Sequence, residues 1–155
     1  MGKSHYDQGG GVNYLCLPDS PEHPVGASSG HQSGSNIYGA EYQHENNPLY
    51  SNTHHDNDVP CVVCDVTGRS RALMIPAKMT CPEGWVKEYQ GLLMSQHSTQ
   101  KGSDFVCVSD GMEHIPGGAA NQNGGLLYVV EASCGSLKCP PYVEGYELAC
   151  VVCTK

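Results

Sequence analysis

The chain has 155 residues, with nine cysteines, one Phe, one Trp and a formal net charge of −8 at pH 7. Its length allows one ordinary domain or two very small ones, and its acidity excludes attraction to nucleic acid or an anionic membrane by charge alone. No window approaches the ~20 apolar residues that a transmembrane helix needs. A core with so few large apolar side chains calls for covalent stabilisation.

The distribution of apolar and turn-forming residues predicts short strands between turns, and therefore an all-β fold. In chain order, apolar or alternating runs predict strands at 14–17, 105–108 and 126–130. Residues 18–36 are rich in Gly, Ser, Pro and His, which is typical of a long surface loop. The one candidate helix, at 85–95, has no clean cap and is expected to be short.

Sequence blocks that occur twice in the same order indicate an internal repeat. Tyr-Leu-Cys-Leu-Pro-Asp at 14–19 matches Phe-Val-Cys-Val-Ser-Asp at 105–110, and Cys-Val-Val-Cys occurs at 61–64 and again at 150–153. Two further matching blocks lie between these, and the offset stays close to ~90 residues throughout.

We therefore expect two tandem, homologous, disulfide-stapled antiparallel β repeats, residues 1–66 and 67–155, which together form one compact domain. The second repeat has an opening section at 75–94 that is almost entirely missing from the first. The first repeat is therefore expected to be truncated at its N-terminus. Polar residues follow Met1 directly, without the apolar region of a signal peptide, so the sequence itself is expected to be N-terminally incomplete.

The density of cysteines predicts an oxidising compartment, and so secretion. Zinc binding is the rival interpretation, because Cys-x-x-Cys occurs twice. Val-Val inside both motifs favours a strand, on which neighbouring side chains point to opposite faces. That arrangement suits two separate disulfides better than one tetrahedral metal site.

Several motifs together give the chain a resemblance to a known family. They are Asn-Tyr-Leu-Cys-Leu-Pro at 13–18, Ile-Tyr-Gly-Ala-Glu-Tyr at 37–42, Val-Pro-Cys-Val-Val-Cys at 59–64, Cys-Pro-Glu-Gly-Trp at 81–85, Cys-Gly-Ser-Leu-Lys-Cys-Pro-Pro-Tyr at 134–142 and the closing Cys-Val-Val-Cys. With these the chain resembles the C-terminal noncollagenous domain of short-chain collagen-like invertebrate proteins, which is related to the terminal domain of collagen IV. The Gly-X-Y repeats of a collagen triple helix are absent from this sequence.

The resemblance implies a specific set of disulfides. In the second repeat the implied pairs are Cys81 with Cys153, Cys107 with Cys150, and Cys134 with Cys139. By the same logic Cys16 pairs with Cys61 in the first repeat. Cys64 is then left as a free thiol, or bonds to another chain, because its partner would lie in the missing opening section.

The function that follows is structural rather than enzymatic. We expect a secreted extracellular-matrix protein, a noncollagenous assembly domain of connective tissue or of a shell or skeletal matrix formed in biomineralization. Its expected partners are further copies of itself, other matrix proteins, a mineral surface or divalent cations; neither nucleic acid, nor membrane, nor a cofactor is expected. The alternative is a secreted lectin-like recognition or defence module.

Two groups of polar residues invite a more chemical interpretation. His54, His55, Asp56 and Asp58 carry side chains that could bind zinc, copper or calcium. A polar loop is the favoured interpretation, because adjacent histidines rarely reach one metal without a bend. Glu-His occurs at 22–23 and at 113–114 and could be a duplicated acid/base pair. Because adjacent side chains on an extended segment point apart, a shared turn is the favoured interpretation. No nucleophile elbow or phosphate-binding loop is present.

Overall fold

The computed structural model describes residues 1–31, 34–44 and 47–155. It confirms the all-β fold, with six strands and one short 3-10 helix. These elements are β1 (Ala40–Tyr42), η1 (Asn52–His54), β2 (Ala72–Pro76), β3 (Val86–Ser95), β4 (Val106–Ser109), β5 (Gly125–Val129) and β6 (Ala149–Thr154). Within the described ranges, no helix has the length and apolar character needed to cross a membrane.

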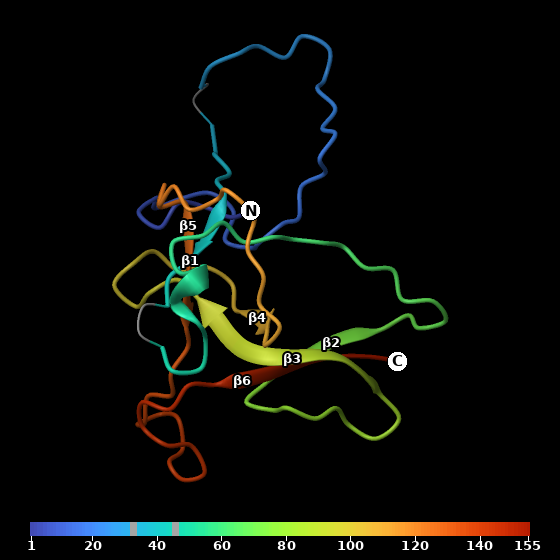
Figure 1. Ribbon diagram of the computed structural model, residues 1–155, viewed down its shortest axis with the longest axis vertical. Helices are drawn as coiled ribbons and strands as arrows, with labels where there is room; N and C mark the ends of the chain where they lie inside the picture. The colour runs from blue at the N-terminus through green and yellow to red at the C-terminus, as the bar shows by residue number, and fades with distance from the viewer. Residues whose placement is uncertain (32–33, 45–46) are drawn as a thin grey trace.

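The strands form one sheet in the order β1-β5-β3-β6-β2, with β4 paired to β3. Strand β3 is its centre, because its first part pairs with β6 and its last part with β4 and β5. Figure 1 shows that β3 curves strongly, which lets one long strand join the β2–β6 ladder to the β1–β5 pair. The sheet is mixed, since β1 runs parallel to β5 while all the other pairs are antiparallel.

The interior is small and centres on two places. Tyr42, Met94 and Leu127 form an apolar cluster where β1, β5 and the end of β3 meet. Strand β6 supplies the second, because Cys150, Val151 and Cys153 are completely buried. Both places lie along β3, so the central strand organises the whole fold.

Two expectations about local structure are wrong. The segment 85–95 is strand β3 rather than a short helix, because strands distant in sequence pair with both of its edges. Residues 14–17 form no strand, although Leu15 exchanges two backbone hydrogen bonds with Met1. Strands β4 and β5, in contrast, lie within one residue of the ranges predicted for them.

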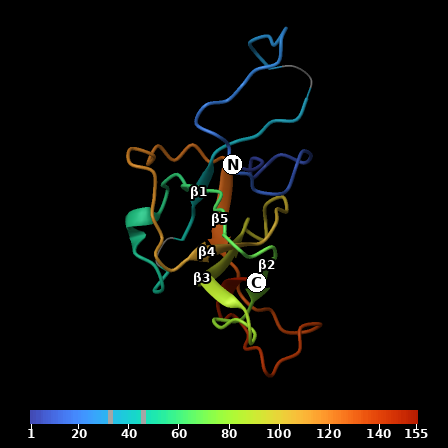
Figure 2. The same cartoon turned by 90° about the vertical axis from the view of Figure 1, so that its right-hand side faces the viewer.

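The expected equivalence of the two repeats is not confirmed. In the described part of 1–66 the only strand is β1, and it pairs in parallel with β5, whereas the other five strands lie in 67–155. The physical reason is that β6 is held between β2 and β3, whereas in the described part of the first half no pair of strands encloses the Cys-Val-Val-Cys segment at 61–64. Residues 18–31 and 34–36 form the predicted loop, which extends away from the sheet in both views (Figures 1 and 2).

Candidate functional site

Four disulfides are present, and three of them join segments that lie 43 or more residues apart in the sequence. The pairs are Cys16–Cys61, Cys81–Cys153, Cys107–Cys150 and Cys134–Cys139, with Cα–Cα distances of 5.3, 5.9, 5.7 and 5.8 Å. These are the pairs that the family resemblance implies. The two Cys-Val-Val-Cys motifs contain four cysteines. Three of them are used in disulfides and the fourth, Cys64, is exposed, so neither motif provides a zinc site.

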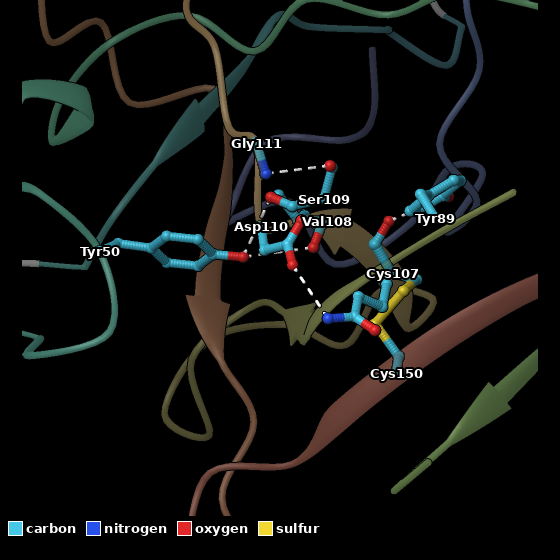
Figure 3. Close-up of a disulfide and its surroundings, with 9 residues drawn as sticks. Tyr50, Tyr89, Cys107, Val108, Ser109, Asp110, Gly111 and Cys150 are labelled. Carbon is cyan, nitrogen blue, oxygen red and sulfur yellow. Dashed lines mark hydrogen bonds between the residues drawn. A yellow bond between two sulfur atoms is a disulfide. The ribbon is translucent and has the colours of Figure 1, made fainter. Parts of the chain in front are cut away.

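The Cys107–Cys150 bond links β4 to β6 beside the middle of β3 (Figure 3). Gly91 of β3 is what allows β4 to come so close, since a Cβ atom there would lie 1.8 Å from the Val108 carbonyl oxygen. Two tyrosines fix β4 further. The hydroxyl of Tyr89 donates to the Cys107 carbonyl at 3.2 Å, and that of Tyr50 lies 3.2 Å from the carbonyls of Val108 and Ser109.

The segment 61–64 exposes its apolar side chains and its thiol to solvent. Val62 and Val63 are 77% and 82% exposed, and the Cys64 thiol is exposed and unpaired. The segment belongs to no strand and is part of the extended green stretch of chain that leads to β2 in Figure 1. Its matching segment in β6, with the same four residues, pairs with strands on both edges, and Cys150, Val151 and Cys153 in it are completely buried.

Cys64 nevertheless lies close to Tyr89 of strand β3. Burial raises the pKa of the Tyr89 phenol, and the neighbouring Cys64 raises it further. The Cys16–Cys61 bond anchors the other end of the segment to the N-terminal arm. The exposed valines are therefore held in place at one end by a covalent bond.

The metal-ligand candidates of the sequence do not gather around one point. Asp56 is bound by amides, because its Oδ1 accepts from Gln43 Nε2 at 2.6 Å and its Oδ2 from Asn121 Nδ2 at 3.2 Å. His55 Nε2 lies 3.5 Å from Asp56 Oδ1, while Asp58 packs against Gly118. Across the described ranges, no group of three or more His, Cys, Asp or Glu side chains is placed to hold a metal ion.

His54 instead meets a histidine that is far away in the sequence. Its Nδ1 lies 3.0 Å from Nδ1 of His114, 60 residues further on, and the ring centroids are 5.1 Å apart. Burial lowers the pKa of His54, and His114 lowers it further. His44 and His55 lie nearby, with ring centroids 6.2 Å apart, so four histidines gather in this region, of which His44 is buried.

The two Glu-His pairs have different surroundings. His114 contacts His54, whereas Glu22 and His23 lie exposed in the long loop. No acid/base pair is therefore duplicated. The two Glu-His pairs share their sequence but not their surroundings, because only the pair at 113–114 contacts another part of the protein within the described residues.

A cleft of ≈ 830 Å³ opens beside the end of β3. Aromatic rings, amides and carboxylates line it, among them His97, Gln100, Phe105, Tyr128, Glu131 and Glu144. The rings of His97 and Tyr128 lie 5.0 Å apart, and Phe105 is 58% exposed. No Lys or Arg is present among its described lining residues. Such a mixture suits a neutral polar or cationic ligand.

Sequence reasoning missed the His54–His114 contact and the cleft. Glu113-His114 was singled out only as a pair of neighbours, and its partner lies 60 residues away. The described residues of the cleft come from four separate parts of the chain, and no local pattern joins them.

The chain matches no protein-family model, no curated protein and no solved structure.

Proposed function

We propose that the chain is a secreted, non-enzymatic structural protein of an extracellular matrix, and that it assembles with further copies of itself through the segment 61–64. The single observation that carries the proposal is the exposure of Val62, Val63 and Cys64, compared with the complete burial of Val151 and Cys153 in the matching segment. Exposed apolar strand-forming residues are a template for pairing with another chain.

The proposed occupant is a second copy of the chain. Eight of the nine cysteines are joined in pairs, so a disulfide between identical chains can use only Cys64 from each. In an isologous dimer the two segments lie opposite each other across a two-fold axis. Val62 and Val63 then pack against their counterparts and leave water, which favours association.

The wider assignment rests on several supporting features. Four disulfides fit an extracellular protein, and the acidic surface suits basic matrix proteins, divalent cations or a mineral. We also propose that both halves derive from one repeat of the collagen-like family. The bonds Cys16–Cys61 and Cys107–Cys150 support this, because they join matching cysteines with sequence separations of 45 and 43.

Light scattering of the oxidised protein tests the assembly step. Wild type should form a dimer or larger species that reducing agent weakens, and Val62→Asp should shift the population toward monomer. Val25→Asp is the matched control, since Val25 is a fully exposed valine in the long loop. A strictly monomeric wild type, or equal effects of the two substitutions, would refute the proposed surface. Proteomics of purified matrix against cell-free body fluid then tests the location.

A second candidate function is lectin-like recognition, and the cleft favours it. Aromatic rings beside amide and carboxylate groups can stack on a sugar and hydrogen-bond to its hydroxyls. The partly exposed Phe105 and the His97–Tyr128 pair would supply the stacking faces. A glycan array tests this function directly: binding that Phe105→Ala and Tyr128→Ala remove supports it, and the absence of any bound glycan argues against it.

A further inference from the structure

The contact between His54 and His114 has the geometry of two ligands on one metal ion. Bonds of 2.0–2.1 Å from a metal to imidazole nitrogens place two such nitrogens about 2.9 Å apart at a right angle and about 3.4 Å apart at a tetrahedral angle. The two Nδ1 atoms lie 3.0 Å apart. An ion bound to both nitrogens would lie to one side of the line that joins them, and the nitrogens are already separated by a distance that suits it.

The two histidines are held in this position by the backbone around them. The loop that carries His54 and the loop that carries His114 are joined by hydrogen bonds on both sides of Asp58. Its N–H donates to the Gly118 carbonyl at 3.0 Å, and its carbonyl accepts from the Ile115 N–H at 3.0 Å. The ligand atoms are thus preorganised, which reduces the entropy lost when an ion binds.

The surroundings of the two rings leave them accessible to solvent. The Tyr42 ring lies on one side of His54, with a centroid distance of 6.3 Å. Both rings remain partly exposed, so an ion can enter from solvent.

We propose that His54 and His114 bind a divalent transition-metal ion, with Cu²⁺ preferred, through their Nδ1 atoms. Imidazole nitrogen suits Cu²⁺, Ni²⁺ and Zn²⁺, and Cu²⁺ heads the order of affinity for such ligands. The 3.0 Å separation lies close to the value for neighbouring corners of a square plane, the geometry that Cu²⁺ prefers. Water completes the coordination. This site differs from the run His54, His55, Asp56 and Asp58, because its second ligand comes from another loop.

Titration with Cu²⁺ alone, on tag-free oxidised protein and followed by calorimetry, tests the site. Wild type should bind one ion, and His54→Ala or His114→Ala should weaken that binding by about 10–100-fold or more. His23→Ala is the matched control, because His23 is exposed in the long loop, and it should leave the affinity unchanged. Equal affinities in wild type, His54→Ala and His114→Ala would overturn the proposal.

Electron paramagnetic resonance of the bound Cu²⁺ gives a second measurement that does not depend on the alanine variants folding. Two imidazole nitrogens should couple to the copper in wild type, and one should remain in His114→Phe, which keeps a ring beside His54. A wild-type spectrum without two imidazole nitrogens would contradict the site. An unchanged spectrum in His114→Phe would do the same.

Discussion

Val62 and Val151 occupy the same place in the same four-residue sequence, yet Val62 is 77% exposed and Val151 is completely buried. Val151 lies in β6, where β2 and β3 cover both edges of the strand. Val62 has no such neighbours in the described part of the chain. The molecule therefore contains both the covered form of this segment and an uncovered form, and the uncovered form is the surface that we assign to assembly.

Association should become stronger as salt is added. Each copy carries a formal charge of −8, so two copies repel each other while the valines attract. The screening length falls from ~30 Å at 0.01 M salt to ~8 Å at 0.15 M. Sedimentation equilibrium of Cys64→Ser, which removes the covalent contribution, should give a larger association constant at the higher salt concentration. A constant that falls with salt would point to ion pairs as the driving force.

The disulfides should differ in their contribution to stability. Chain-entropy estimates give about 4 kcal/mol for a loop of the length that Cys107–Cys150 closes, and about 2 kcal/mol for the short loop of Cys134–Cys139. The sequence separations are 43 and 5. Denaturant unfolding of the two double alanine variants should therefore show the larger loss for Cys107 and Cys150. A larger loss of stability on removing Cys134 and Cys139 would contradict the prediction, and would show that the bond between β4 and β6 contributes little to the stability of the fold.

Gly91 should tolerate no side chain. A Cβ atom at this position would lie 1.8 Å from the Val108 carbonyl oxygen, and backbone cannot move aside without separating β3 from β4. Gly91→Ala should cost about 3 kcal/mol or more, measured by thermal or denaturant unfolding. Gly102→Ala is the control, because no atom lies within 4 Å of its added Cβ, and it should change stability by less than about 0.5 kcal/mol. Similar stabilities for the two variants would contradict the close approach of β4.

His44 should make the protein less stable in mildly acidic solution. Its side chain is 4% exposed, and its Nδ1 atom has no hydrogen-bond partner. Burial lowers the pKa of His44 below the ordinary value of 6.5, while the Ser51 carbonyl opposes the shift. The rings of Tyr42, Tyr50 and His55 face it, and His54 lies near enough to lower the pKa further.

The sign follows from proton binding. As the pH falls below 6.5, the unfolded chain takes up the proton first, so the free energy of unfolding decreases until the lower folded-state pKa is passed. Above 6.5 His44 contributes no pH dependence. Denaturant unfolding without added metal should show this decrease in wild type and a smaller one in His44→Gln, with His23→Gln as the control. An identical pH profile in wild type and His44→Gln would exclude His44 as the cause.

Some of these features could be predicted from sequence and some could not. Strands β4 and β5 follow from apolar residues within a few positions of each other, and such patterns are local. Strand β3 was misread because Leu92, Leu93 and Met94 are consecutive and do not alternate, so only its distant partners decide between helix and strand. The two Cys-Val-Val-Cys segments show the same limit, since identical residues differ in structure according to whether neighbouring strands are present.

The histidine site illustrates the limit for function. His54 could be named as a candidate ligand from its side chain alone, but its partner His114 lies 60 residues away in a loop positioned by the sheet. Residue type indicates which chemistry is available at a position. The arrangement of the loops determines which of those residues meet.

Peptide mapping of the oxidised protein without reduction tests the central claim most directly. Mass spectrometry of the peptides that contain Cys64 distinguishes a free thiol from a bond between chains. The account predicts a peptide in which Cys64 of one chain is bonded to Cys64 of another, together with the four bonds within the chain. Cys64 recovered as a free thiol in a monomeric protein, or bonded to a cysteine of its own chain, would contradict assembly through the segment 61–64.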